Sequence, residues 1–295
     1  MNFKNYSRAS IKAVTANDSI FKSRIEACYK ATIPSSIKQC RETGRIDAFK
    51  LDWKPGMNKQ PHIFWDSDLV KVLEGIANIL AIYPDAELEK EYDEIVSLIA
   101  SAQQPDGYLN TYFTVVEPEK RWSNLFDCHE LYCAGHMIEA GVAAYELLGK
   151  RELLDVVCKY ADYIDSVFGE EEGKRRGVPG HEEIELALVR LYNATGNERY
   201  LKLSKYFIDE RGREPNFYTE VEKTKQYKWQ LERHQAHMPV REQSVATGHS
   251  VRAVYLYSGM ADIATLTNDE KLFEACERLF KSITERRMYI TGGIG

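Results

Sequence analysis

Apolar residues recur along most of this chain every three or four positions, which is the period of an α-helix that buries one face. One such series is Leu69, Val72, Leu73, Ile76, Ile79 and Leu80. The same pattern predicts further helices over Met137 to Leu148, Ile184 to Leu191 and Val251 to Leu266. Strand patterns, in which apolar and polar residues alternate, are nearly absent. The sequence therefore predicts an all-α fold.

A short polar turn follows each of these four helices, and a second helical stretch follows each turn. The turns run over Tyr83 to Leu88, Leu148 to Leu153, Thr195 to Tyr200 and Thr267 to Leu272. A Gly, Asn or Asp residue ends the first helix and an acidic residue opens the next, as the helix dipole favours. An earlier helix is predicted near Phe21 to Cys40. Four repeated helical hairpins indicate a solenoid or a closed helical toroid, and their irregular spacing favours the toroid.

The longest connection between predicted helices runs from Glu210 to Thr247 and has no periodicity of its own. It contains Trp229, Arg233, His234 and His237. A connection of this length is usually a functional lid or a disordered segment.

Polar residues stand where each of the four first helices begins. The openings read Trp65-Asp66-Ser67-Asp68, Asp127-Cys128-His129-Glu130, Pro179-Gly180-His181-Glu182 and Thr247-Gly248-His249-Ser250. In a toroid of alternating inner and outer helices, equivalent helix ends lie at one mouth, so these side chains are expected to converge on one substrate-binding pocket. Its predicted residues are Asp66, Asp68, His129, His181 and His249. Helix capping is the alternative, and it is preferred for the two aspartates taken alone; histidine is a poor N-cap, which favours the pocket for the histidines.

Two other groups of residues have an ordinary structural explanation. His129, Cys133 and His136 share one helix face and could in principle bind zinc. A buried cysteine beside packed imidazoles is the commoner arrangement, so no metal site is predicted here. The aromatic residues in Gln103 to Phe113 either stack on a sugar ring or fill one end of the barrel, and their spacing does not decide between the two.

Composition narrows the class of protein further. The 295 residues are 44% hydrophobic and 28% charged, which is ordinary for a soluble globular protein. A net charge of −6 argues against a nucleic-acid partner. No apolar run is long enough to span a membrane, and the first residues lack a signal-peptide pattern. The six scattered cysteines indicate reduced thiols, so a cytoplasmic protein is expected.

Several segments together resemble glycoside hydrolase family 127, the β-L-arabinofuranosidases. They are Phe64 to Asp68, Gln103 to Phe113, His129 to Tyr132 with Gly135-His136, Gly180 to Leu188, Gly248 to Ala253 and Arg286 to Gly295. The resemblance covers essentially the whole chain. It implies an (α/α)6 barrel followed by β-sandwich domains, and retaining hydrolysis of β-L-arabinofuranosides or related sugars. It also implies that the residues contacting the sugar include His129, His181 and His249.

The resemblance also implies what is missing from residues 1–295. In the family, an acid/base Glu follows the stretch that matches Thr291 to Gly295, and a Glu with three zinc-holding cysteines, one of them the nucleophile, comes later. None of the six cysteines here matches those positions. We therefore expect a truncated (α/α)6 barrel, incomplete at its C-terminal end, that has no catalytic residue and binds no zinc of its own. No measurable hydrolysis is expected from residues 1–295 alone.

The exact sugar stays open at this point. Ala48 occupies a position where a polar, sugar-contacting residue is expected. The nearest spare carboxylates are those of Glu182, Glu183 and Glu242, and none of them is assigned as an acid or base.

Two alternative functions also remain. One is another sugar-acting (α/α)6 enzyme, such as an epimerase or an unsaturated-uronide hydrolase. The other is a non-catalytic helical scaffold or sugar-binding protein. A carbohydrate is the expected partner, a homodimer is one possible assembly, and neither nucleic acid nor a membrane is expected to bind.

Overall fold

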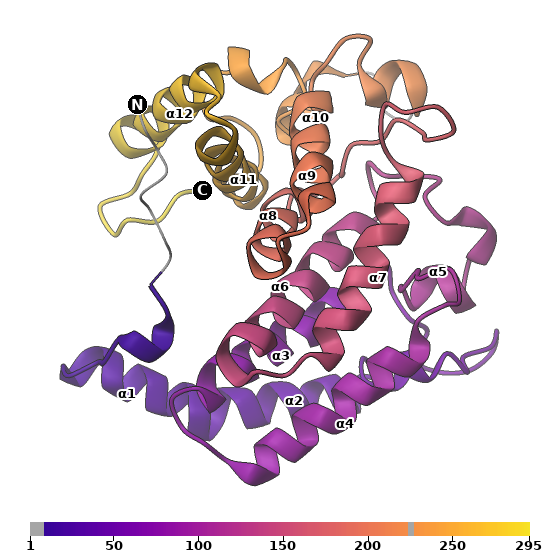
Figure 1. The fold of residues 1–295 in the computed structure, drawn as a ribbon, viewed down its shortest axis with the longest axis vertical. Coiled ribbons are helices and arrows are strands. Elements are labelled where there is room, and N and C mark those ends of the chain that lie inside the picture. Colours follow the sequence, from indigo (N-terminus) through magenta and orange to yellow (C-terminus); the bar gives the residue numbers. More distant parts are fainter. Residues whose placement is uncertain (1–8, 224–226) are drawn as a thin grey trace. The chain divides into compact units, whose positions relative to one another are not determined.

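The computed structural model describes residues 9–223 and 227–295, and within these ranges it contains helices but no β-strand (Figure 1). The longer helices form the four predicted hairpins. These are α3 (Trp65–Leu80) with α4 (Ala86–Ala102), α6 (Glu130–Leu148) with α7 (Glu152–Val167), α8 (Ile184–Thr195) with α9 (Glu198–Glu210), and α11 (Ser250–Thr267) with α12 (Glu270–Arg286). The all-α prediction is confirmed.

Shorter helices precede and connect the hairpins. The helix predicted near Phe21 to Cys40 is present as three consecutive elements, α1 (Ser19–Ala27), η2 (Cys28–Thr32) and α2 (Ile33–Glu42). The remaining elements are η1 (Ile11–Ala13), η3 (Asp47–Lys50), α5 (Tyr112–Val115), η4 (Pro118–Lys120), η5 (Phe217–Val221), α10 (Lys228–Arg233) and η6 (Val240–Glu242).

The polar turns of the hairpins cap the helices that follow them. Side-chain oxygens of Asp85, Asn197 and Asp269 accept hydrogen bonds from backbone N–H groups in the first turns of α4, α9 and α12. Gly196 and Asn268 end α8 and α11 in the left-handed conformation, at φ values of 73° and 55°. The turn residues therefore stop one helix and start the next, as the sequence predicts.

The chain forms two compact units. The first, here called the histidine unit, consists of the described residues of Trp122–Gly135 and Ile164–Gly295. The second, the N-terminal unit, consists of the described residues of Ser7–Arg121 and His136–Tyr163.

In the histidine unit, α8 packs against α9 and α11, and α11 packs against α12 (Figure 1). Their facing side chains form one buried apolar core, with members that include Val189, Ile208, Leu256, Met260, Ile263, Leu272 and Leu279. In the N-terminal unit, α3 packs against α2 and α4. Burial of these faces explains the apolar spacing seen in the sequence, because residues three or four apart share one side of a helix.

The described part of the connection from Glu210 to Thr247 is folded, which departs from the prediction of a lid or a disordered segment. It contains η5, α10 and η6. The side chains of Phe217 and Tyr218 are at most 3% exposed, and that of His234 is 2% exposed. Buried contacts with other parts of the histidine unit stabilise this connection, and such contacts leave no trace in helical periodicity.

Candidate functional site

The structure brings three of the predicted site residues together. The ring centroid of His181 lies 5.9 Å from that of His129 and 5.8 Å from that of His249. All three side chains are half-buried, and all three belong to the histidine unit. His181 is thus the centre of a cluster of three imidazoles, called the histidine cluster below.

The three histidines do not occupy identical positions at their helix starts. His129 directly precedes α6, whereas His181 lies three residues before the first residue of α8. His249 is the N-cap of α11, and its Nδ1 atom accepts a hydrogen bond from the backbone N–H of Arg252 at 3.4 Å. Histidine is a poor N-cap in general, but His249 caps α11 in addition to belonging to the cluster.

Two tyrosines pack around the central imidazole. The ring of Tyr132 lies 4.4 Å from that of His181 and 5.5 Å from that of His129, centroid to centroid. The ring of Tyr255 lies 6.1 Å from that of His181. These tyrosines place aromatic rings beside His129 and His181.

Glycines next to two of the histidines allow the backbone to approach other segments closely. A Cβ atom on Gly180 would lie 2.0 Å from the carbonyl oxygen of Leu125. A Cβ atom on Gly248, where φ is +78°, would lie 2.1 Å from the carbonyl oxygen of Glu232. Both distances are far shorter than any normal contact, so the packing of the segments that carry the histidines requires glycine at both positions.

A fully buried arginine ties together the segments around His181. Arg211 lies at the C-terminal end of α9 and has no solvent exposure. Its Nη1 atom lies 2.8 Å from Oε1 of Glu182, and its Nη2 atom lies 3.0 Å from Oε1 of Glu185. The guanidinium also donates hydrogen bonds, each 2.8 Å long, to the carbonyl oxygens of Pro179 and His234. Arg211 therefore connects α9, α8, the loop that carries His181 and the connection that carries His234.

His234 is a fourth imidazole in the histidine unit, and it supports this loop from within the core. Its Nδ1 atom lies 2.6 Å from the carbonyl oxygen of Gly180, the residue before His181. Its Nε2 atom lies 3.3 Å from Nη1 of Arg252, which is 7% exposed. Arg252 thus contacts His234 through its guanidinium and His249 through its backbone N–H.

The surroundings lower the pKa of two imidazoles in the cluster. Burial, followed by the positive charge of Arg252, lowers the pKa of His181 to about 3. Burial and the charges of Arg252 and Arg233 also lower the pKa of His249. Both rings are therefore neutral near pH 7, and each can donate one hydrogen bond and accept another.

Burial acts in the opposite direction on Glu182. Desolvation raises the pKa of this carboxyl from 4.5 to about 8, and the nearby Glu185 adds to the effect, while the charges of Arg211 and Arg252 oppose it. Between pH 4.5 and 8 the folded protein therefore keeps a proton that the unfolded chain has released, so the free energy of unfolding falls as the pH rises through this window. The depressed pKa of His181 has the reverse effect, but only below about pH 6.5.

Substitution of Glu182 by glutamine should remove the pH dependence that this group causes. We expect the free energy of unfolding of the unchanged protein to fall by up to about 2 kcal/mol between pH 6.5 and 8, a range of 1.5 units at 1.36 kcal/mol per unit. Urea unfolding at both pH values should show this fall in the unchanged protein and in the control Glu242→Gln, whose side chain is exposed. An equal fall in Glu182→Gln would show that another group is responsible.

The two predicted aspartates lie in the N-terminal unit and have structural partners there. Asp66 is 1% exposed, and its two carboxylate oxygens accept hydrogen bonds from the backbone N–H and the hydroxyl of Thr111, at 2.8 and 2.5 Å. Burial raises the pKa of Asp66 to about 6. Asp68 forms an ion pair with Arg45, with Oδ2 2.7 Å from Nε. Neither aspartate caps α3, because Phe64 is the N-cap residue and no side chain bonds there.

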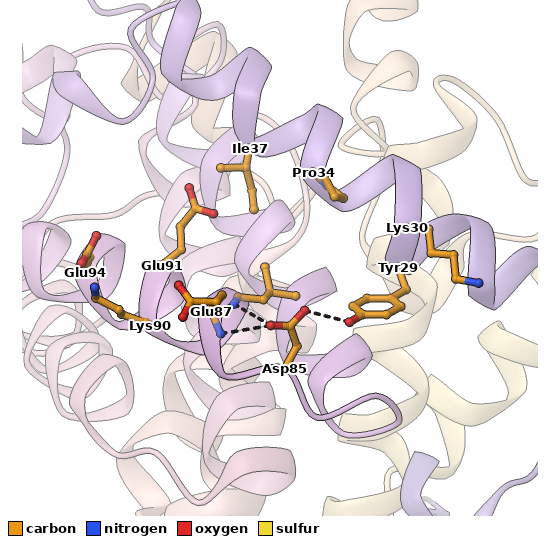
Figure 2. A pocket seen from close by; sticks show the side chains of 10 residues that line it. Tyr29, Lys30, Pro34, Ile37, Asp85, Glu87, Lys90, Glu91 and Glu94 are labelled. Carbon is orange, nitrogen blue, oxygen red and sulfur yellow. Dashed lines mark hydrogen bonds between the residues drawn. The ribbon is translucent and has the colours of Figure 1, made fainter.

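A hollow of about 560 Å³ in the N-terminal unit contains none of the predicted site residues (Figure 2). Figure 2 shows the hydroxyl of Tyr29 donating to Asp85 at one end of it, at 2.7 Å. The other carboxylate oxygen of Asp85 accepts from the backbone N–H groups of Glu87 and Leu88. Asp85 thereby caps the start of α4.

His129, Cys133 and His136, which share one helix face and were considered as zinc ligands, are not grouped as metal ligands in the structure. Cys133 is fully buried and His136 is 5% exposed, both within α6. Throughout residues 9–223 and 227–295, no three His, Cys, Asp or Glu side chains are arranged to hold a metal ion.

The histidine cluster of this helical chain gathers three imidazoles and two tyrosines, which are groups suited to hydrogen bonding and stacking with a sugar. A family model described as β-L-arabinofuranosidase, GH127 catalytic domain, matches residues 13–295. The chain belongs to this family of glycoside hydrolases.

Known relatives agree with this assignment. The chain is 44% identical over 247 residues to a non-reducing end β-L-arabinofuranosidase of Bifidobacterium longum subsp. longum, a match that covers 79% of the chain. The structure of a GH127 β-L-arabinofuranosidase from Geobacillus stearothermophilus T6 is 46% identical, with a TM-score of 0.91 over 96% of the chain. A second GH127 β-arabinofuranosidase structure is 38% identical, with a TM-score of 0.87 over 97% of the chain.

The predicted family and the predicted fold class, an (α/α)6 barrel, are confirmed by these matches. The chain spans 37% of the length of the Bifidobacterium protein, and 47% and 44% of the chains of the two solved structures.

Proposed function

We propose that residues 1–295 supply the sugar-binding part of a glycoside hydrolase that acts on β-L-arabinofuranosides. The observation that carries this proposal is the half-buried histidine cluster. In it, the ring centroid of His181 lies 5.9 Å from that of His129 and 5.8 Å from that of His249. The two first relatives described above are both named β-L-arabinofuranosidases, which supports this choice of sugar.

In this proposal the imidazoles bind and orient the sugar. Neutral imidazoles donate and accept hydrogen bonds with hydroxyl groups, and Tyr132 and Tyr255 offer ring faces beside them. That Asp66 and Asp68 also bind the sugar stays a prediction. Orientation of the reacting sugar contributes to hydrolysis because it replaces a random encounter by a fixed geometry.

Cleavage of a glycosidic bond also needs a proton donor and a nucleophile or base. Glu182 is adjacent to His181 in the sequence, but it is fully buried and paired with Arg211, so we do not assign it either role. The family resemblance implies a zinc ion held by cysteine thiolates. The residues present do not fit such a site, because no suitable group of three ligands exists among the described residues. No step is therefore assigned to zinc in this chain.

The proposal predicts which simple sugars bind. Ligand-observed NMR of the chain with methyl glycosides should show saturable binding of methyl β-L-arabinofuranoside, and about tenfold weaker binding of methyl α-L-arabinofuranoside and methyl β-D-galactopyranoside. A preference is expected because fixed imidazoles can match only one arrangement of hydroxyl groups. Equal binding of all three, or binding of none, would contradict the proposed function and favour a helical scaffold.

Assembly and location are further parts of the proposal. None of the helices in the described ranges is long and apolar enough to cross a membrane. We propose a cytoplasmic protein and a homodimer; light scattering of the purified chain decides between monomer and dimer directly.

A further inference from the structure

The backbone carbonyl of Glu182 determines where the imidazole of His181 carries its proton. The Nδ1 atom of His181 lies 2.9 Å from this oxygen. A carbonyl oxygen only accepts hydrogen bonds, so Nδ1 must be the donor. The ring is neutral near pH 7, because burial and the charge of Arg252 lower its pKa to about 3. The Nε2 atom of His181 is therefore unprotonated and acts as a hydrogen-bond acceptor.

His249 has the opposite arrangement. Its Nδ1 atom accepts a hydrogen bond from the backbone N–H of Arg252, at 3.4 Å. A backbone N–H only donates, so Nδ1 of His249 has no proton. Burial and the charges of Arg252 and Arg233 lower the pKa of this ring as well, so it is neutral near pH 7. Its single proton is on Nε2, which is therefore a hydrogen-bond donor.

We propose that His181 and His249 form a donor–acceptor pair that recognises hydroxyl groups and selects neutral sugars over uronates. Their ring centroids are 5.8 Å apart, their planes differ by 68°, and both side chains are half-buried. A hydroxyl group both donates and accepts, so one hydroxyl or two neighbouring hydroxyls can satisfy both Nε2 atoms. A carboxylate only accepts, and its oxygen would meet the lone pair on Nε2 of His181.

The surrounding contacts keep this pattern of donor and acceptor in place. Arg252, His129 and His249 act on His181 through their charges, and the tyrosines Tyr132 and Tyr255 pack against its ring. Arg252 is buried, and its guanidinium contacts Nε2 of His234 within the core of the histidine unit. The inference rests on the proposed function, and it adds the polarity of each imidazole and the class of sugar that this polarity selects.

The first test reads the protons directly and needs no sugar. Long-range ¹H–¹⁵N spectra of the chain with ¹⁵N-labelled histidine, recorded near pH 7.5, distinguish the two neutral tautomers. Variants His181→Phe and His249→Phe assign the signals. We expect a protonated Nδ1 on His181 and a protonated Nε2 on His249. The same tautomer on both residues, or a positively charged ring on either, would overturn the proposal.

The second test compares methyl β-L-arabinofuranoside with a methyl furanoside of the same configuration whose CH₂OH group is oxidised to a carboxylate. We expect the unchanged chain to bind the neutral sugar at least tenfold more tightly. His181→Phe should reduce this ratio to below about threefold, because it removes the acceptor, whereas His249→Phe should not reduce it. A carboxylate analogue that binds the unchanged chain as tightly as the neutral sugar would overturn the proposal.

The two tests separate this inference from the proposed function. If neither sugar binds, the proposed function fails, and so does the selection of a neutral sugar. If the neutral sugar binds but the two histidines have the same tautomer, the proposed function stands and the donor–acceptor pair is wrong.

Discussion

Replacement of Arg211 by methionine is expected to lower the free energy of unfolding by about 3–5 kcal/mol, the cost of removing one partner from the buried ion pair that Arg211 forms with Glu185. Arg211, Glu182 and Glu185 all have zero exposure. Methionine fills a similar volume but leaves both carboxyl groups and two backbone carbonyls without the guanidinium that they contact. Urea unfolding followed by circular dichroism measures the loss.

Arg213 provides the matched control because it lies two residues further along the chain and its side chain is 52% exposed. It pairs with the exposed Glu170 and with Glu210, which also has Arg176 as a partner. Exposed ion pairs contribute about 0–1 kcal/mol, so Arg213→Met should have a correspondingly small effect. Equal losses in the two variants would show that the buried cluster is not what stabilises the segments around His181.

Replacement of His181 by phenylalanine is expected to weaken binding of methyl β-L-arabinofuranoside by about 10- to 100-fold. The phenyl ring keeps the packing against Tyr132, but it has no nitrogen with which to bind a hydroxyl. A sugar hydroxyl left unsatisfied in a half-buried site costs about 1–3 kcal/mol, and 1.4 kcal/mol corresponds to a tenfold change in affinity. Titration calorimetry or ligand-observed NMR of both proteins gives the ratio.

The control for this variant is Tyr206→Phe. The hydroxyl of Tyr206 accepts a hydrogen bond from the backbone N–H of Gly177 at 2.9 Å, so its removal costs one bond from a side chain to the backbone. His181→Phe loses the comparable bond to the carbonyl of Glu182. We expect Tyr206→Phe to lower stability by a similar amount, about 1 kcal/mol, without a change in sugar affinity. A weakening of binding in both variants would mean that lost stability explains the effect of His181→Phe.

The helices and their turns could be predicted because their signals are local. Leu256, Met260 and Ile263 follow the helical period that buries one face of α11, and Asp269 caps α12 from within the adjacent turn. These signals lie within a few residues of the structures that they specify. The three histidines could be predicted to be neighbours because the hairpin repeat relates their positions.

The buried contacts around the histidine cluster could not be predicted, because they join residues far apart in the sequence. Arg211 directly follows the amphipathic helix α9, and nothing in the sequence near it indicates that its side chain is buried. Its partners are distant in the sequence: they come from residues 179–185 and from His234. The sequence around Asp66 is typical of a helix cap. In the structure, however, both of its carboxylate oxygens accept hydrogen bonds from Thr111, 45 residues away. In both cases a tertiary contact decides the role of a charged residue, and local pattern carries no record of it.

The proposed sugar site can be tested most directly by a titration in which each imidazole is observed separately. Long-range ¹H–¹⁵N spectra of the histidine-labelled chain would be recorded with increasing methyl β-L-arabinofuranoside. We expect saturable shifts of the signals of His129, His181 and His249, all with one dissociation constant, and no comparable shift of His234, which is 2% exposed and bonded on both nitrogens. Saturable binding of the sugar that leaves the signals of the three clustered histidines unchanged would contradict the account.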